Sequence, residues 1–448
     1  MKDLTQGNIF KNFILFAIPL ILSNVLSVAY NTVDLIIVSR CLGENGLAAV
    51  GSTATFMEIL NSVLWGLGTG SSIYLATLFG AKKYRDFTNA IKLNLLAMGV
   101  LSLVLALLVF ALKKPIFAFL NIGEDIAADA WRYLGIYLTG LVFLGINWHC
   151  GYIFNAMGNP SFPLKLSLFS FVGNIVGDLV LIQGLGMGVA GAALATVTFA
   201  FLTTLLYLAK FRGEFAKMGC AGQKLYFEAK CLTRAGRLGL PNMVQQFIMY
   251  LASTMVQPLI NGIGPAAIAG YAASMKLYSL NSLIFQSSSK ALMNYNAQCM
   301  GAGKLNQINR GLKTALAQVF LFTLPMMVLC LIAPRFFAGL FFTDPYCEGA
   351  GYTVQYLLFC IPFLPLQVLD NLFHNFYRGV LKIPVIVVST AINTVVRIGL
   401  AYLLVPKLGM TGVYAALVIS WGAESLYLVG LYLSGRWKTE EFCLAERA

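Results

Sequence analysis

The sequence is poor in charge. Only 11% of its 448 residues are Asp, Glu, Lys or Arg, whereas 58% are hydrophobic. A soluble domain carries about a quarter charged residues, and a single core cannot bury so much apolar side-chain surface. A water-soluble globular protein is therefore excluded, and lipid is expected to surround most of the chain.

The sequence also has few of the residues that build catalytic and metal sites. It contains two histidines, and its nine cysteines occur singly, without the paired spacing of zinc or redox sites. We find no phosphate-binding Walker A motif and no Ser/His/Asp arrangement. These absences argue against an enzyme, a resident cofactor or metal, and an ATP-driven pump.

The most abundant feature is long apolar segments. Each is close to the ~20 residues that a helix needs to cross the hydrocarbon of a bilayer. Twelve such segments lie near 13–39, 47–78, 88–112, 131–156, 162–183, 190–211, 234–261, 266–299, 311–333, 351–377, 383–405 and 411–434. We predict an all-α polytopic membrane protein with twelve transmembrane helices.

The formal charge of +13 follows this topology. If the N-terminus lies inside, most lysines and arginines fall in inner segments, such as 82–85 and 210–237, and few in outer loops. That bias fixes the orientation of membrane proteins. We expect a multi-pass protein of the inner (cytoplasmic) cell membrane with both termini in the cytoplasm. The bilayer explains the positive charge, and no nucleic-acid partner is expected.

The two halves of the chain repeat each other. Three pairs of motifs recur at offsets of 219 to 223 residues: "LAAVG" and "AAIAG", "GAKKYRDFTNAIK" and "GAGKLNQINRGLK", "LGMGVAGAAL" and "LGMTGVYAAL". The most polar stretch separates six spans from six. We therefore predict an N-terminal bundle at 1–211, a cytoplasmic linker at 212–237 and a C-terminal bundle at 238–448.

Six is an even number, so both halves enter the membrane from the same face. The predicted repeat is parallel, with a pseudo-two-fold axis along the membrane normal. Two such bundles leave a cleft between them, and rocking about it gives alternating access. This architecture is typical of a secondary transporter.

Two acids lie deep in the apolar segments of the first half, Asp34 in span 1 and Asp178 in span 5. A charge in the bilayer costs at least ~2.5 kcal/mol, and such residues are functional by default. Asn174 is one helical turn before Asp178, and Thr196 lies at a similar depth in span 6. We predict that these four side chains converge.

Crowded carboxylates in a poor dielectric favour their protonated form, so the cluster can take up protons near neutral pH. Its oxygens are equally suited to a hard cation such as Na⁺. The sequence leaves both coupling ions open, as it leaves open that each acid only bonds a neighbouring helix. Pro19 in span 1 removes a backbone hydrogen bond and predicts a kink, either static or a moving hinge.

The second half carries charges of both signs within its spans. These residues form either an ion-pair network, in which the charges neutralise one another, or part of a substrate cavity or proton path. They are Lys276, Lys290, Asp370, Arg397 and Glu424.

Two stretches resemble the multidrug and toxic compound extrusion (MATE) family of transporters. The first span contains "FAIPLILSNVLSVAYNTVDLIIVSRCLG", and the fifth and sixth contain "LFSFVGNIVGDLVLIQGLGMGVAGAALAT". The resemblance implies a V-shaped pair of six-helix bundles that exports organic, often cationic, drug-like compounds in exchange for H⁺ or Na⁺. We expect such a transporter to act as a monomer.

The DinF-like branch of that family is similar in having its ion site in the N-terminal bundle. The resemblance carries that role to Asp34, Asn174, Asp178 and Thr196, and the role of bending proline to Pro19. The seventh span, "LPNMVQQFIMYLASTMVQPLI", lacks the acid of the branch with a C-terminal site. The alternative function is a lipid-linked saccharide flippase, for which a basic central cavity is expected.

Overall fold

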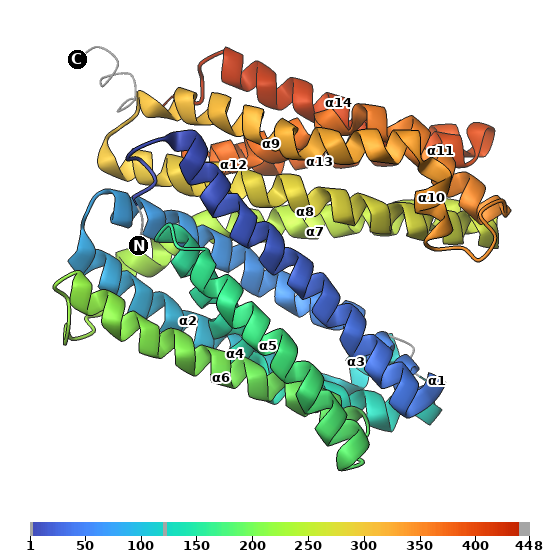
Figure 1. Ribbon diagram of the computed structural model, residues 1–448, viewed down its shortest axis with the longest axis horizontal. Helices are drawn as coiled ribbons and strands as arrows, with labels where there is room; N and C mark the ends of the chain where they lie inside the picture. Colours follow the sequence, from blue (N-terminus) through green and yellow to red (C-terminus); the bar gives the residue numbers. More distant parts are fainter. Residues whose placement is uncertain (1–2, 120–122, 439–448) are drawn as a thin grey trace. The chain divides into compact units, whose positions relative to one another are not determined.

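The fold is helical throughout the residues that the structure describes. This structure is a computed structural model, and it describes residues 3–119 and 123–438. No strand occurs within those ranges, and the predicted all-α class is confirmed (Figure 1). The extreme termini, which we expect in the cytoplasm, lie outside the described residues.

The chain forms two compact units. Unit 1 contains Leu22–Leu240, and unit 2 contains Leu4–Ile21 together with the chain from Pro241 onward. The domains predicted at 1–211 and 238–448 differ from these units at the N-terminus, since residues 4–21 pack with the second half. There the backbone N–H of Leu4 donates to Gln298 Oε1 at 2.9 Å, and the rings of Phe13 and Tyr295 meet edge to face with their centroids 5.2 Å apart.

Unit 1 is built mainly from the helices of the first half. Their bounds are α1 Ile9–Gly80, α2 Tyr84–Ala111, α3 Lys113–Phe119, α4 Glu124–Ala156, α5 Ser161–Asp178, the π-helix η1 Leu179–Gly184 and α6 Val189–Lys217. The predicted linker at 212–237 is helical at both ends, because α6 extends to Lys217 and α7 begins at Ala229.

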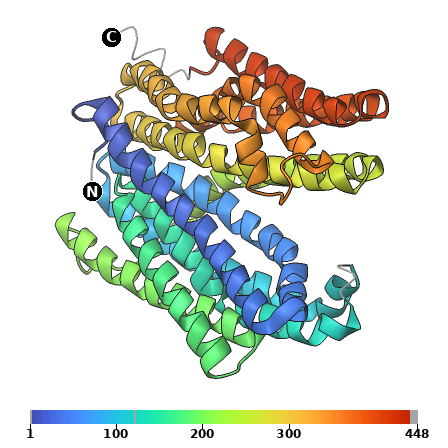
Figure 2. The same cartoon turned by 45° about the vertical axis from the view of Figure 1, so that its right-hand side comes forward.

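Unit 2 contains the helices of the second half. Their bounds are α7 Ala229–Ile263, α8 Pro265–Ala302, α9 Gln307–Ile332, α10 Pro334–Gly339, α11 Glu348–Cys360, the 3₁₀-helix η2 Ile361–Phe363, α12 Leu364–Gly379, α13 Pro384–Leu408 and α14 Met410–Leu433. The first turns of α7, up to Leu240, belong to unit 1. The antiparallel helices α13 and α14 lie side by side (Figure 2).

The helices account for twelve membrane crossings. Among the described residues, nine helical segments are long and apolar enough to span a bilayer. One of them, α1, has 72 residues and breaks at Gly43, whose φ is 70° and ψ −161°, so it crosses twice. Helices α7 and α8 have 35 and 38 residues and supply the other two crossings, although they are more polar.

Backbone geometry repeats between the two halves. Residues with positive φ recur at an offset of 221 to 223 positions: Gly43 and Gly264, Lys82 and Gly303, Gly158 and Leu381, Gly188 and Gly409. Each pair ends or begins equivalent helices, so the duplication predicted from three short motifs extends to the turns. Pro19 and Pro241 are likewise equivalent, at an offset of 222.

A glycine makes the same close helix contact in each half. A Cβ added to Gly191 would lie 3.0 Å from the carbonyl carbon of Leu181, and one added to Gly412 would lie 2.7 Å from that of Leu404. Small residues of this kind let membrane helices approach backbone to backbone. The last two helices of each half are therefore held by an equivalent contact.

Replacing Gly412 by alanine should destabilise unit 2, because the new methyl group meets backbone atoms that cannot rotate away. We expect a loss of about 1–3 kcal/mol, measured as a lower temperature midpoint for loss of the monodisperse protein in detergent. Gly399→Ala on α13 is the matched control, because its Cβ would meet nothing within 4 Å. Equal midpoints for the two variants would contradict the role given to this contact.

Candidate functional site

The acids predicted in unit 1 are both buried. Asp34 lies on the part of α1 that belongs to unit 1 and is 8% exposed, and Asp178 is the last residue of α5 and is fully buried. Asn174, one turn earlier on α5, is 1% exposed. Thr196 on α6 is half-buried. Three helices of one unit thus supply the four predicted side chains.

Glycines on α5 bring this helix against α6. A Cβ on Gly173 would lie 2.0 Å from Cε1 of Phe199, and one on Gly177 would lie 3.1 Å from Cβ of Ala195. The two glycines are four residues apart, which places them on one face in the small-xxx-small pattern of packed membrane helices. The residues that follow them, Asn174 and Asp178, are held beside α6 by this packing.

The helix changes its geometry directly after Asp178. Residues Leu179–Gly184 form the π-helix η1, which follows α5 without a loop. Short π-helical turns are rare and occur frequently at functional sites. Sequence reasoning did not predict this element, because no residue type in "LVLIQG" distinguishes a π-turn from an α-turn.

The two carboxyl groups share one electrostatic environment. Asp34 and Asp178 lie close enough for the charge of each to act on the other, and both act on Tyr30 and Tyr133. Tyr30 is one turn before Asp34, and its hydroxyl is 3.0 Å from the hydroxyl of Thr196. The structure therefore brings Asp34, Asp178 and Thr196 together. It adds Tyr30 and Tyr133, which sequence reasoning missed.

These acids lack the partners that stabilise buried charge. Apart from the contact between the two acids, neither oxygen of Asp178 nor Oδ1 of Asp34 accepts a hydrogen bond from the described residues, and Nδ2 of Asn174 donates none. None of the ion pairs in the described ranges includes either acid. Two unit charges about 4 Å apart repel by roughly 4 kcal/mol at an effective dielectric constant of 20. A proton or a metal cation between the carboxyl groups would remove this repulsion.

The charges predicted in unit 2 do not pair as expected. Lys276 is exposed, Lys290 is half-buried, and Arg397 donates to the hydroxyl of Tyr271 at 3.2 Å. Within the described residues, none of these three cations forms an ion pair with a carboxylate. The expected neutralisation among them is thus corrected by the structure.

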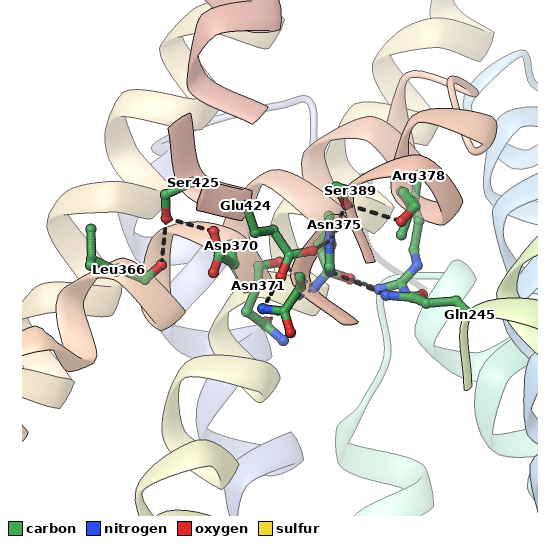
Figure 3. A network of polar contacts seen from close by, with 12 residues as sticks. Gln245, Leu366, Asp370, Asn371, Asn375, Arg378, Ser389, Glu424 and Ser425 are labelled. Atoms are coloured by element: carbon green, nitrogen blue, oxygen red, sulfur yellow. Dashed lines mark hydrogen bonds and ion pairs between the residues drawn. The ribbon is translucent and has the colours of Figure 1, made fainter. Parts of the chain in front are cut away.

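The acids of unit 2 instead bond to neutral groups and to a histidine. Asp370 accepts a 2.6 Å hydrogen bond from Ser425 (Figure 3). Glu424 pairs with His374 at 2.9 Å. The place of His374 in this polar cluster could have been found from the spacing of polar residues in the sequence. The residues 370, 371, 374, 375 and 378 are spaced as one polar face of α12.

The fold and the buried acids together define a membrane transporter with a duplicated helical architecture. The sequence pattern of the MatE family matches residues 19–180 and 241–403. The chain belongs to this family, whose members are transporters and not enzymes. Both matched ranges begin at the equivalent prolines, Pro19 and Pro241.

Known proteins similar to the chain match it along nearly its whole length. The probable multidrug resistance protein YpnP of Bacillus subtilis (strain 168) is 24% identical over 441 residues, 97% of each chain. The multidrug export protein MepA of Staphylococcus aureus (strain MRSA252) is 22% identical over 94% of this chain and 92% of its own. A solved structure, an outward-facing multidrug resistance MATE family transporter of the MOP superfamily, matches with a TM-score of 0.89 at 21% identity, covering 98% of both chains.

The packing of α5 on α6 can be tested by a double-mutant cycle. Gly173→Ala should cost about 1–3 kcal/mol, because its methyl group collides with the ring of Phe199. In a Phe199→Ala background, where the ring is absent, the same substitution should cost almost nothing. The measurement is the thermal midpoint of the four purified proteins. Additive losses, without a coupling energy of about 1 kcal/mol, would contradict the contact.

Proposed function

We propose that this chain exports drug-like small molecules across the cell membrane in exchange for H⁺ or Na⁺. The observation that carries the proposal is the pair of buried acids, Asp34 and Asp178, which no cation of the described residues neutralises. The relatives named as multidrug proteins support export of such compounds. Asn174 and Thr196 complete the proposed ion site, as in the DinF-like branch.

The coupling follows from the free energy of the empty site. A doubly ionised pair in a poor dielectric is unfavourable, so conformations in which the pair holds an ion are stabilised relative to those in which it does not. An ion that enters from outside thereby shifts the population of transporter conformations. Export is driven if the substrate binds less tightly to the ion-loaded conformation, and the two effects are reciprocal.

The proposal also covers the membrane location, the oligomeric state and the cofactors of the protein. We place it in the cytoplasmic membrane with both termini inside, as a monomer that needs no cofactor besides its coupling ion. The alternative, export of lipid-linked saccharides, requires cations that face a substrate. Rescue of a drug-sensitive strain, but not of a polysaccharide-export mutant, would favour drug export.

The first test removes the charge of each acid. Asp34→Asn and Asp178→Asn should each reduce dye efflux from inverted vesicles by about tenfold or more, since coupling is lost with the charge. Asp129→Asn is the matched control, because Asp129 is a half-exposed aspartate that forms an ion pair with Arg132. Efflux at the wild-type rate in both site variants, with normal protein levels, would refute the proposed ion site.

The second test identifies the coupling ion. Vesicles that contain the purified protein are given either a pH gradient or a sodium gradient of equal size. Exchange through a proton site predicts efflux with the pH gradient alone, and exchange through a sodium site predicts efflux with the sodium gradient alone. An efflux rate that is unchanged by either gradient would contradict ion exchange.

The third test concerns Pro19 as a hinge. Proline removes one backbone hydrogen bond of α1, and Pro19 lies two residues before the point where α1 passes from unit 2 to unit 1. Pro19→Ala should stiffen α1 and lower the efflux rate several-fold without lowering the thermal midpoint. Pro325→Ala is the control, because Pro325 lies inside α9, a helix of unit 2 alone. Equal efflux rates in the two variants would mean that the kink is static.

A further inference from the structure

A buried imidazole–carboxylate pair lies in unit 2, in the half of the chain that does not contain the site proposed above. Nε2 of His374 on α12 is 2.9 Å from Oε1 of Glu424 on α14. The two residues are 9% and 4% exposed. Such a pair, away from water, needs defined hydrogen positions on all its polar atoms.

The neighbours of the pair fix where its hydrogens are. Ser389 donates its hydroxyl hydrogen to the carbonyl of Ile386 at 2.9 Å, so it accepts from Nε2 of His374, also at 2.9 Å. Nε2 therefore carries a hydrogen, which Ser389 and Glu424 share. Asn393 donates to Oε2 of Glu424 at 2.9 Å. Both oxygens of Glu424 accept hydrogen bonds, as an ionised carboxylate does.

The other ring nitrogen of His374 is held without a hydrogen. Arg378 donates from Nη2 to Oε1 of Gln245 at 2.5 Å, so the NH₂ group of Gln245 is the end that faces Nδ1 of His374, at 3.2 Å. Arg378 also donates from Nε to Asn242 at 2.7 Å. The hydrogen bonds from Arg378 to Gln245 and from Gln245 to His374 thus select the neutral imidazole and leave Nδ1 as an acceptor.

With His374 neutral, the pair carries the single negative charge of Glu424, and groups of both signs lie around it. Arg378 and Asp370 on α12 are the nearest along the helix, and Asp370 and Glu424 act on each other. From α8, Tyr278 lies within electrostatic reach of Glu424, Asp370 and Arg397 of α13. Lys290, also on α8, lies within reach of Arg378. Among the described ion pairs, the one that contains Glu424 joins it to His374.

We propose that His374 and Glu424 form a proton-binding site, separate from the acids of unit 1, in which the arriving proton binds Nδ1 of His374. One N–H bond forms as one O–H bond of a hydronium ion breaks and a water molecule leaves, and the pair becomes imidazolium and carboxylate. The amide of Gln245 then turns so that its oxygen accepts from Nδ1–H. Arg378 loses that acceptor and keeps its contacts to Asn242 and Asn375.

The consequence of protonation is a change in the attachment of α7 to α12. Gln245 and Asn242 lie on α7, whereas His374 and Arg378 lie on α12. In the unprotonated state both amides accept from Arg378, and in the protonated state Gln245 bonds to the histidine instead. The state of one imidazole therefore selects between two sets of contacts at the start of the α7 segment in unit 2.

The composition of the chain makes a direct measurement practical, because it contains two histidines. Full-length protein labelled with ¹⁵N-histidine gives two sets of ring signals in lipid nanodiscs, and His149→Gln assigns them. At neutral pH, His374 should show the tautomer with hydrogen on Nε2. On acidification both ring nitrogens should become protonated. His149, which is buried in unit 1 beside Ser71 at 3.3 Å, serves as the internal control.

Two variants should move the protonation of His374 in opposite directions. Glu424→Gln removes the negative partner of the imidazolium, so about tenfold less of it should form at the pH of the wild-type midpoint. Arg378→Gln removes a positive neighbour and frees Gln245, so more imidazolium should form at that pH. The His149 signals should match the wild type in both, which shows that the fold is intact. If Glu424→Gln does not fold, the fraction of imidazolium in Arg378→Gln still tests the proposal.

Three results would overturn the proposal. They are hydrogen on Nδ1 at neutral pH, no protonation of His374 down to about pH 5, and unchanged titration in the folded variants. The measurement needs no transport, so its outcome is separate from that of the Asp34 and Asp178 variants. Lost efflux in those variants with no titration of His374 would leave the unit 1 site standing and refute this one.

Discussion

The structure depends on the cost of placing a carboxylate where no water can solvate it. In hydrocarbon every polar group must find a partner within the protein, and an ionised acid needs more than one hydrogen bond. Asp34 and Asp178 meet this requirement only in part, because each has the other acid as a neighbour and neither forms an ion pair with a cation of residues 3–119 and 123–438. The packing of α5 on α6, fixed by Gly173 and Gly177, holds Asp178 in place beside α6. An arrangement that would be a defect in a static protein suits the ion exchange proposed above.

The two units treat buried acids in different ways, although they descend from one repeat. At an offset of 223 residues, Asn174 corresponds to Arg397 and Asp178 to Ala401, so the acid site of unit 1 has no counterpart. Unit 2 places its acids elsewhere, on α12 and α14, and surrounds them with hydroxyl, amide and imidazole groups. The two halves keep the same turns and glycine contacts, because few residue types fit a positive φ or a close approach of two backbones. Their buried polar side chains have diverged.

The sequence allowed the architecture to be predicted, together with the neighbourhood of several buried polar side chains. Apolar length gave the spans, the motif pairs gave the duplication, and depth along helices placed Asp34, Asn174, Asp178 and Thr196 together. Those inferences use only the rise of a helix and the thickness of a bilayer. Partners were not predictable, because they depend on how each helix is rotated about its axis. Glu424 therefore bonds His374 and not one of the lysines, and Tyr30, rather than a residue one position away, reaches Thr196.

The equivalent prolines lie where a helix passes from one unit to the other. Helix α1 passes from unit 2 to unit 1 after Ile21, and α7 passes from unit 1 to unit 2 at Pro241. Pro19 and Pro241 therefore mark the same place in the two repeats, and a missing backbone hydrogen bond weakens each helix there. Each helix also carries a residue of a buried polar cluster, Asp34 on α1 and Gln245 on α7. A change in the ionisation of either cluster therefore changes the contacts of a helix that both units share. That helix is weakened by a proline near the point where it passes from one unit to the other.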